Sequence, residues 1–315
     1  MRLNPIVKKD VRVQSRSMKI CWGVFAYEFI LAFVFFLVMI IIQQNSRYAT
    51  DNIYSRMVWL YPILAITQLV ILGIVVPVRS ASAISGEKER QTFDIMMTTG
   101  MTPFSIIMGK VMTAVVQSML YVVASLPVMA LPFIIGGMPW SSLFWFLGIA
   151  LLMSFFAASI GILCSSFCRK SIGAVIMSYG FYGVIFIGTF LPFTVGQIAV
   201  SSRGQNNGLR EAEFLILLLN PIVYLTEFFS LIMSGDSVVR ESANAAILGA
   251  NSKGILKYAV SEYHWLILST LLFLAVSFLF LWLAARKINP IKKHGKRTFA
   301  RKKEPVGAVG QEGAE

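Results

Sequence analysis

Charged side chains are scarce in this chain of 315 residues, where they make up 14% of the sequence. An average soluble domain carries roughly 25%. Apolar residues account for 57%, and the mean hydropathy is +0.72. A water-soluble fold hides most of its apolar surface in a core, whereas a membrane protein also presents apolar surface to lipid. The composition therefore indicates an integral membrane protein.

Histidine and cysteine, which supply most zinc ligands, are rarer still. His264 and His294 belong to no metal-binding or catalytic motif. Cys164 and Cys168 are one helical turn apart, but no further ligand lies beside them, and Cys21 makes the number of cysteines odd. We therefore expect no metal site, no catalytic residues and no disulfide framework, with the cysteines as small buried residues.

Basic residues outnumber acidic ones, and the net charge is +13. Such an excess can indicate nucleic-acid binding, but here the basic residues flank the first and last apolar runs, near residues 2–19 and 286–303. Basic clusters beside membrane spans mark the cytoplasmic side. We therefore expect membrane lipids and no nucleic acid as partners, and both termini in the cytoplasm of a bacterial cell with the chain in its plasma membrane.

Six apolar runs are long enough to cross a bilayer core, which takes roughly 20 helical residues. The sequence thus predicts an all-α integral membrane protein, with one membrane domain over residues 1–290 and a basic tail without fixed structure over 291–315. The predicted spans lie near 20–42, 57–78, 111–135, 143–167, 172–192 and 264–285.

A seventh apolar stretch, residues 214–233, is interrupted by Asn220-Pro221 and followed in the same stretch by Glu227. A proline and a carboxylate are both costly in an isolated span. A seventh span would also place the basic tail outside. We therefore predict a pair of short helices that enter the membrane part-way from the outer side, before the last span.

Two polar features lie near the first span. Residues 4–18 intersperse apolar and basic side chains, which predicts an amphipathic helix in the cytoplasmic interface. Glu28 falls inside the span, where a carboxylate is costly and points to function by default. It lies about two turns from the cytoplasmic end, however, so we expect it to reach the interface or to pair with a basic residue.

The stretch "ISGEKERQTFDIMMTTG", residues 84–100, concentrates charge between two apolar runs. On a helix, Glu87 and Glu89 point roughly 200° apart, so they cannot share one substrate. Helical spacing instead predicts pairs of Glu87 with Arg90 and of Arg90 with Asp94. A helix over about 87–97 would end at Gly100.

Thr102-Pro103 then has the sequence of an N-cap and first turn, which predicts a second short helix over about 102–108. A solvent-exposed loop that only connects two spans would not need the apolar Phe93, Phe104 and Ile106. We therefore interpret the loop as a cytoplasmic docking surface for a soluble partner. The chain does not bind ATP by a phosphate loop, because the positions around Gly109-Lys110 lack the second glycine and the hydroxyl that this loop requires.

"SGEKERQTFDIMMTTGMTPFSIIMGK" resembles the segment between the second and third spans of type-2 ABC transporter permeases, and "LNPIVYLTEFFSLIMSG" resembles their outer Asn-Pro segment. The six spans, the N-terminal helix and the long outer segment fit the same family over nearly all of residues 1–290. Gln91 stands where this family commonly has glycine, and Ser105 where it commonly has an acidic residue. These departures would tune the contact for a particular partner.

The resemblance implies a non-catalytic permease subunit of an ABC exporter, paired with a second permease that is a copy or a homologue. ATP and magnesium would be bound by a separate ABC ATP-binding subunit, and this chain would hold no cofactor. Export is expected because no loop of a binding-protein-dependent importer is recognisable. Spans two and five would line the translocation path, with Thr67, Gln68 and Tyr179 as lining groups. The implied coupling surface consists of Glu87, Glu89, Arg90, Phe93, Thr102, Pro103, Phe104, Ser105 and Ile106.

Two alternatives remain open at this point. A secondary carrier or channel, working without an ATPase, would need charges or broken helices within the membrane, for which Glu28 and the prolines at 62, 127 and 132 are the candidates. A membrane-bound enzyme would need a catalytic constellation, which the sequence does not show.

Overall fold

The computed structural model describes residues 7–8, 10, 12, 17–46, 57–93, 95, 102–203, 215–241 and 263–288. These residues form helices and turns, with no strand among them. Six of the helices are long and apolar enough to cross a membrane, which confirms the predicted all-α class and the number of spans. The predicted tail, 291–315, lies outside the described residues.

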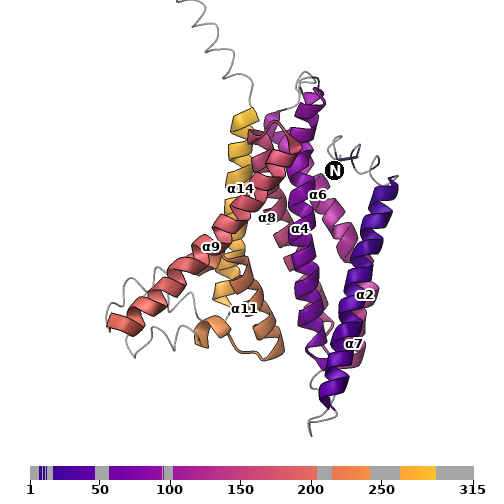
Figure 1. Cartoon of the computed structure of the whole chain (residues 1–315), viewed down its shortest axis with the longest axis vertical. Helices are drawn as coiled ribbons and strands as arrows, with labels where there is room; N and C mark the ends of the chain where they lie inside the picture. The colour runs from indigo at the N-terminus through magenta and orange to yellow at the C-terminus, as the bar shows by residue number, and fades with distance from the viewer. Residues whose placement is uncertain are drawn as a thin grey trace, which may run out of the picture.

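The six long helices form one bundle (Figure 1). The start of the first long helix and the end of the last lie at the same end of the bundle, as an even number of spans requires, and we call this the upper end. The opposite end, where the chain turns from α7 to α8, is the lower end. The long helices are α2 (Met18–Ser46), α4 (Leu60–Glu89), α6 (Pro103–Ala124), α8 (Ser141–Phe167), α9 (Ser171–Arg203) and α14 (His264–Ile288).

Helices α4 and α8 lie side by side and run in the same direction. At the lower end, the Tyr61 hydroxyl donates to the carbonyl oxygen of Ser142 at 2.9 Å. Near the upper end, the Ser165 hydroxyl oxygen accepts the backbone N–H groups of Ile84 (3.0 Å) and Ser85 (2.8 Å). The partners are 80 or 81 positions apart at both ends, so the two helices keep one register along their length. Small and hydroxyl-bearing residues allow such close approach between membrane helices.

The third predicted span is two helices rather than one. Helix α6 ends at Ala124, and α7 (Leu126–Gly136) begins after Ser125, which caps both helices. Pro127, at the start of α7, has no N–H to donate to the ladder of α6, so the single helix predicted over 111–135 is interrupted. Gly137 ends α7 with a φ of 69°, a left-handed conformation that glycine adopts freely.

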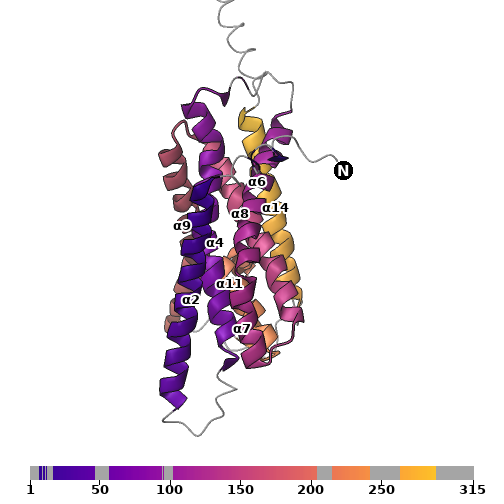
Figure 2. The ribbon, with the colours of Figure 1, turned by 90° about the vertical axis from the view of Figure 1, so that its right-hand side faces the viewer.

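Helix α2 lies at the right-hand side of the bundle in Figure 1, the side that faces the viewer in Figure 2. Its buried apolar residues form a single stripe of Tyr27, Leu31, Phe35 and Val38, while most of its other large side chains are exposed. Such exposure is expected where lipid replaces water around a helix. Cys21, on this helix, is exposed, and Cys164 is buried, so the prediction of burial is wrong for Cys21.

The seventh apolar stretch is broken at the predicted place. A short 3-10 helix, η1 (Leu217–Leu219), ends at Asn220, and α11 (Pro221–Met233) follows. The Asn220 side chain accepts the N–H of Ile222 at 2.9 Å and donates to the Thr189 hydroxyl at 2.9 Å. The pair packs against α14, where the Ser269 hydroxyl donates to a carbonyl of η1 at 3.0 Å. Its entry into a membrane stays a prediction.

In the N-terminal segment, the described residues at 7, 8, 10 and 12 are helical. Val7 is buried, whereas Lys8 and Arg12 are exposed. This division fits the predicted amphipathic character, and the interfacial position stays a prediction.

Candidate functional site

Helix α4 reaches eleven residues beyond the predicted span and ends at the upper end of the bundle, at Glu89. The N–H of Gln91 donates to the carbonyl of Lys88 (3.2 Å), and that of Thr92 to the carbonyl of Glu87 (3.0 Å). These two hydrogen bonds together form a Schellman motif, which requires a residue in the left-handed conformation after the cap. Gln91 supplies it with a φ of 58°. The helix predicted over 87–97 is therefore wrong, because the backbone turns at Gln91.

The predicted N-cap at Thr102 is confirmed: its hydroxyl oxygen accepts the N–H of Ser105 at 3.3 Å, and Pro103 follows as the first helical residue. The helix that begins there does not stop near Met108, however. It continues through Gly109 and Lys110 to Ala124, so the predicted separate short helix is the first part of the third spanning helix.

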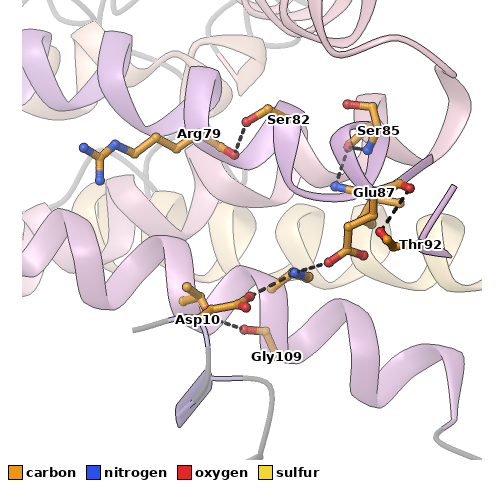
Figure 3. A network of polar contacts seen from close by, with 11 residues as sticks. Asp10, Arg79, Ser82, Ser85, Glu87, Thr92 and Gly109 are labelled. Carbon is orange, nitrogen blue, oxygen red and sulfur yellow. Dashed lines mark hydrogen bonds and ion pairs between the residues drawn. The ribbon is translucent and has the colours of Figure 1, made fainter. Parts of the chain in front are cut away.

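Glu87 points inward, to a partner other than the predicted Arg90. Its carboxylate lies 2.6 Å from the Nζ of Lys110 on α6, and the carboxylate of Asp10 lies 2.9 Å from the same amine (Figure 3). Lys110 is buried, with 8% of its surface exposed. One buried cation thus joins the end of α4, the start of α6 and the N-terminal segment. Asp94, the other predicted partner of Arg90, lies outside the described residues.

Two further side chains of α4 attach its end to other helices. Glu89 accepts the N–H (3.0 Å) and the hydroxyl (2.6 Å) of Ser171, the first residue of α9. A carboxylate at a helix N-terminus is stabilising, because the helix dipole is positive there. Lys88 donates to the carbonyls of Ser165, Ser166 and Cys168 at the end of α8, at 2.6–3.2 Å. Glu87 and Glu89 thus bind different neighbours, although both line the polar cavity described below.

The predicted docking residues divide by exposure. Arg90, Thr102 and Phe104 are exposed, the last with 44% of its surface. Phe93, Pro103 and Ser105 are half-buried, and the Phe93 ring lies 5.8 Å from the Lys88 amine. Ile106 is fully buried, so it cannot contact a docked partner. The exposed part of this end also includes Ile95, at 67% exposure, which sequence reasoning left out.

Beneath this surface lies a polar cavity of about 700 Å³, lined in part by Asp10, Arg79 and Gln117. The Arg79 guanidinium donates to the Gln117 side chain at 3.2 Å and to the Tyr121 hydroxyl. Sequence reasoning missed this cluster because Arg79 and Lys110 fall just outside the predicted spans. The signal in the sequence was that both residues stand directly beside a predicted span. Once α4 and α6 are extended to their observed ends, both residues belong to the bundle.

The three predicted path residues lie in different surroundings. The Tyr179 hydroxyl of α9 donates to the carbonyl of Ile74 on α4 at 2.6 Å, so the second and fifth spans touch there. Thr67 is half-buried and donates to the carbonyl of Ile63 in its own helix. Gln68 is fully buried, and among the described residues neither polar atom of its side chain has a hydrogen-bond partner.

Glu28 does not have the predicted partner within the part of the chain that the structure describes. Its Oε1 atom is buried there without a hydrogen bond. The described ranges also hold no group of three or more His, Cys, Asp or Glu residues placed to bind a metal ion.

A family model described as ABC-2 family transporter protein matches residues 41–286, which include the five later spans and the outer helix pair. The chain belongs to the ABC-2 transporter family. A search of curated proteins found no match. This ABC-2 protein is thus a multi-pass membrane protein and a permease component of an ABC-type transporter.

Proposed function

We propose that this ABC-2 protein is the permease subunit of an ATP-driven exporter. It works with separate ABC ATP-binding subunits, which hold ATP and magnesium, and with a second permease that is a copy or a homologue. The positions around Gly109-Lys110 lack the residues of a phosphate loop, and in this proposal the energy enters from the ATP-binding partner.

The observation that carries this proposal is that one exposed surface is joined, through residues beside it, to the three helices α6, α8 and α9. The surface formed by Arg90, Thr102 and Phe104 stands at the junction of α4 and α6. Beside these residues, Lys88 binds α8, the exposed Glu89 binds α9, and Glu87 binds Lys110. A partner that pushes on this surface would move several spans together. The family implies such a partner, an ABC ATP-binding subunit.

The distribution of charge supports a cytoplasmic upper end in the plasma membrane. Lys88, Arg169, Lys170, Arg286 and Lys287 all lie at the ends of helices there. Lysine and arginine are enriched on the cytoplasmic side of membrane spans. This orientation places the surface around Phe104 where a soluble ATPase can reach it.

The contact of Tyr179 with α4 supports a path along the second and fifth spans. Of the three lining groups, Tyr179 and Thr67 are half-buried and therefore accessible in part from outside the subunit. Gln68 is enclosed within the subunit and would reach the path only if α4 moves.

The proposal is tested by co-expressing the chain with a candidate ABC ATP-binding subunit from the same genome and measuring their affinity in nanodiscs. Phe104→Ala removes the exposed apolar side chain, and we expect it to weaken binding by about tenfold, as for a central interface residue. Phe144→Ala is the matched control, because Phe144 is 72% exposed at the lower end of α8.

Equal affinity of the wild type and Phe104→Ala would place the coupling surface elsewhere. Failure of the wild-type chain to bind the ATPase, together with transport driven by an ion gradient alone, would favour the secondary carrier.

A further inference from the structure

An apolar groove of about 470 Å³ opens between α8, α9 and α14, near the upper end of the bundle. This volume lies within the range of small-molecule sites, roughly 300–1,000 Å³. The groove is open to the surroundings, since Phe167 at its edge is 48% exposed. Its apolar lining consists of Leu163, Phe167, Met177, Phe181, Phe280 and Leu283.

Two cations close the upper end of this groove. The Arg286 guanidinium lies 3.5 Å from the centre of the Trp282 ring, and the Lys287 amine lies 4.9 Å from the centre of the Phe167 ring. These cation–π contacts hold both charges beside the apolar lining. Among the residues that the structure describes, no carboxylate lies within ion-pair distance of either cation.

The position of the cations along α14 matches the level of lipid phosphates. The helix begins at His264, and roughly 20 residues cross the hydrocarbon core. Arg286 and Lys287 stand in the last turn, just beyond that length. The apolar lining lies at the level of the acyl chains and the charges at the level of the head groups. Cations are favourable near the C-terminus of a helix, and this general effect explains the presence of the two charges. It does not explain the apolar groove beside them.

We propose that this groove binds an anionic phospholipid from the leaflet at the upper end. One acyl chain fills the groove, and the phosphate lies between Arg286 and Lys287. An anionic lipid brings the negative charge that the site lacks, whereas a zwitterionic head group carries a cation of its own. The proposal goes beyond the transport function and does not depend on an ATP-binding partner.

A second copy of the chain is a poorer occupant of this face. Two subunits related by a two-fold axis along the membrane normal present the same surface to each other at the same depth. The interface would then collect two copies of Arg286 and Lys287 at one level, where like charges repel. A lipid phosphate neutralises these charges instead.

The test uses the full chain in nanodiscs and a phosphatidylglycerol whose acyl chain carries a photoactivatable diazirine. Cross-links are mapped by mass spectrometry, and we expect them in the tryptic peptides that contain Met177 or Phe280. Unlabelled phosphatidylglycerol and phosphatidylcholine with identical acyl chains serve as competitors, and soluble glycerol phosphate serves as a probe of the anion alone.

Two matched pairs of variants separate the head group from the groove. The double variant R286Q/K287Q should weaken competition by phosphatidylglycerol about fivefold per cation removed. R240Q, an exposed arginine outside the groove, should not change it. Met177→Trp fills the groove and should abolish the mapped cross-links, whereas Val184→Trp, on the exposed side of the same helix, should retain them. Thermal midpoints of all variants show whether they remain folded.

The site is an anionic lipid site if phosphatidylglycerol competes better than phosphatidylcholine and loses that advantage in R286Q/K287Q. Equal competition by the two lipids, cross-links that map elsewhere, or displacement of the probe by glycerol phosphate as effectively as by the lipid would each overturn the proposal.

Discussion

At the scale of single residues, the end of α4 depends on one residue in an unusual conformation. Gln91 has a φ of 58°, and among the described residues it is the one non-glycine residue with a positive φ. The left-handed region costs a residue with a Cβ about 1–2 kcal/mol relative to the right-handed one. A Schellman motif favours glycine at this position, because glycine has no Cβ atom to strain the left-handed conformation.

Replacing Gln91 by glycine should therefore stabilise the protein. We expect the free energy of unfolding to rise by about 0.5–1 kcal/mol, seen as a higher thermal midpoint of the purified permease. The control is Arg90→Gly, since Arg90 has a φ of −82° and gains nothing from glycine. A lower midpoint for Gln91→Gly would show that a contact of the Gln91 side chain stabilises the protein by more than the relief of backbone strain does.

Lys110 is the second residue whose effect follows from its surroundings. It is buried between Glu87 and Asp10, whose side chains are 25% and 20% exposed. Removing one partner of a buried ion pair leaves the other charge unpaired, which typically costs about 3–5 kcal/mol. Because the two carboxylates retain some contact with water, we expect Lys110→Met to cost about 2–3 kcal/mol.

Glu87→Gln should cost less than Lys110→Met, because Asp10 still pairs with the lysine. The double variant E87Q/K110M should recover part of the loss, since one unpaired carboxylate is then removed. Thermal midpoints of the three proteins check this order. A midpoint for E87Q as low as that for K110M would mean that Asp10 contributes little.

The sequence predicted the local features of this site but not its partners. The separation of Glu87 and Glu89, the N-cap at Thr102 and the break at Asn220-Pro221 follow from spacing and from local hydrogen bonding, and the structure has all of them. The pairing of Glu87 with Lys110 joins residues on two helices, so no helical spacing could predict it. Asp10 is 100 positions from Lys110 in the chain.

At the scale of helices, apolar runs located the spans but not their ends. Helix α4 continues to Glu89 and α6 starts at Pro103, because helices in the bundle extend past the apolar core as far as caps and tertiary contacts support them. The break at Ser125 was missed because Pro127 was interpreted as a proline within a span. A proline is tolerated at the first turn of a helix, and here it is the second residue of α7.

The α4–α8 contact depends on Gly161. A Cβ atom added to Gly161 would lie 1.9 Å from the Oγ and 2.9 Å from the Cβ of Ser80, and 3.0 Å from a backbone nitrogen of α4. Gly161→Ala should therefore push the helices apart and lower the thermal midpoint markedly, by overpacking that costs about 1–3 kcal/mol. Gly148 is the matched control on the same helix, because nothing lies within 4 Å of an added Cβ there.

Gly148→Ala should be neutral or stabilising, since alanine has the higher helix propensity. Combining Gly161→Ala with Ser80→Gly removes the clashing side chain and should restore part of the lost stability. If Gly161→Ala alone kept the wild-type midpoint, the two helices would be further apart than the structure has them.

At the scale of the whole molecule, the end of α4 is a junction of the bundle. Lys88 contacts the end of α8, Glu89 the start of α9, and Glu87 the start of α6 through Lys110. Composition and apolar runs predicted the number of spans, which the structure confirms. They could not predict this junction, because its bonds depend on how the helices are arranged, and those of Lys88 and Glu89 reach residues about 80 positions away.

The junction leads to a prediction about how movement spreads after ATP binding, which rests on the proposed function. In the complex with the ATPase, trapping of the nucleotide should change hydrogen exchange at the ends of α4, α8 and α9. In the variant K88M/E89Q, the surface at Phe104 is intact, so binding and the change at α4 should persist. The changes at α8 and α9 should shrink, because the bonds from Lys88 and Glu89 no longer transmit the movement.

Arg169→Met, at an exposed position of the same end, is the control and should behave as the wild type. Unaltered exchange at α8 and α9 in K88M/E89Q would assign the transmission to the Ser165 contacts with α4, which this variant leaves in place.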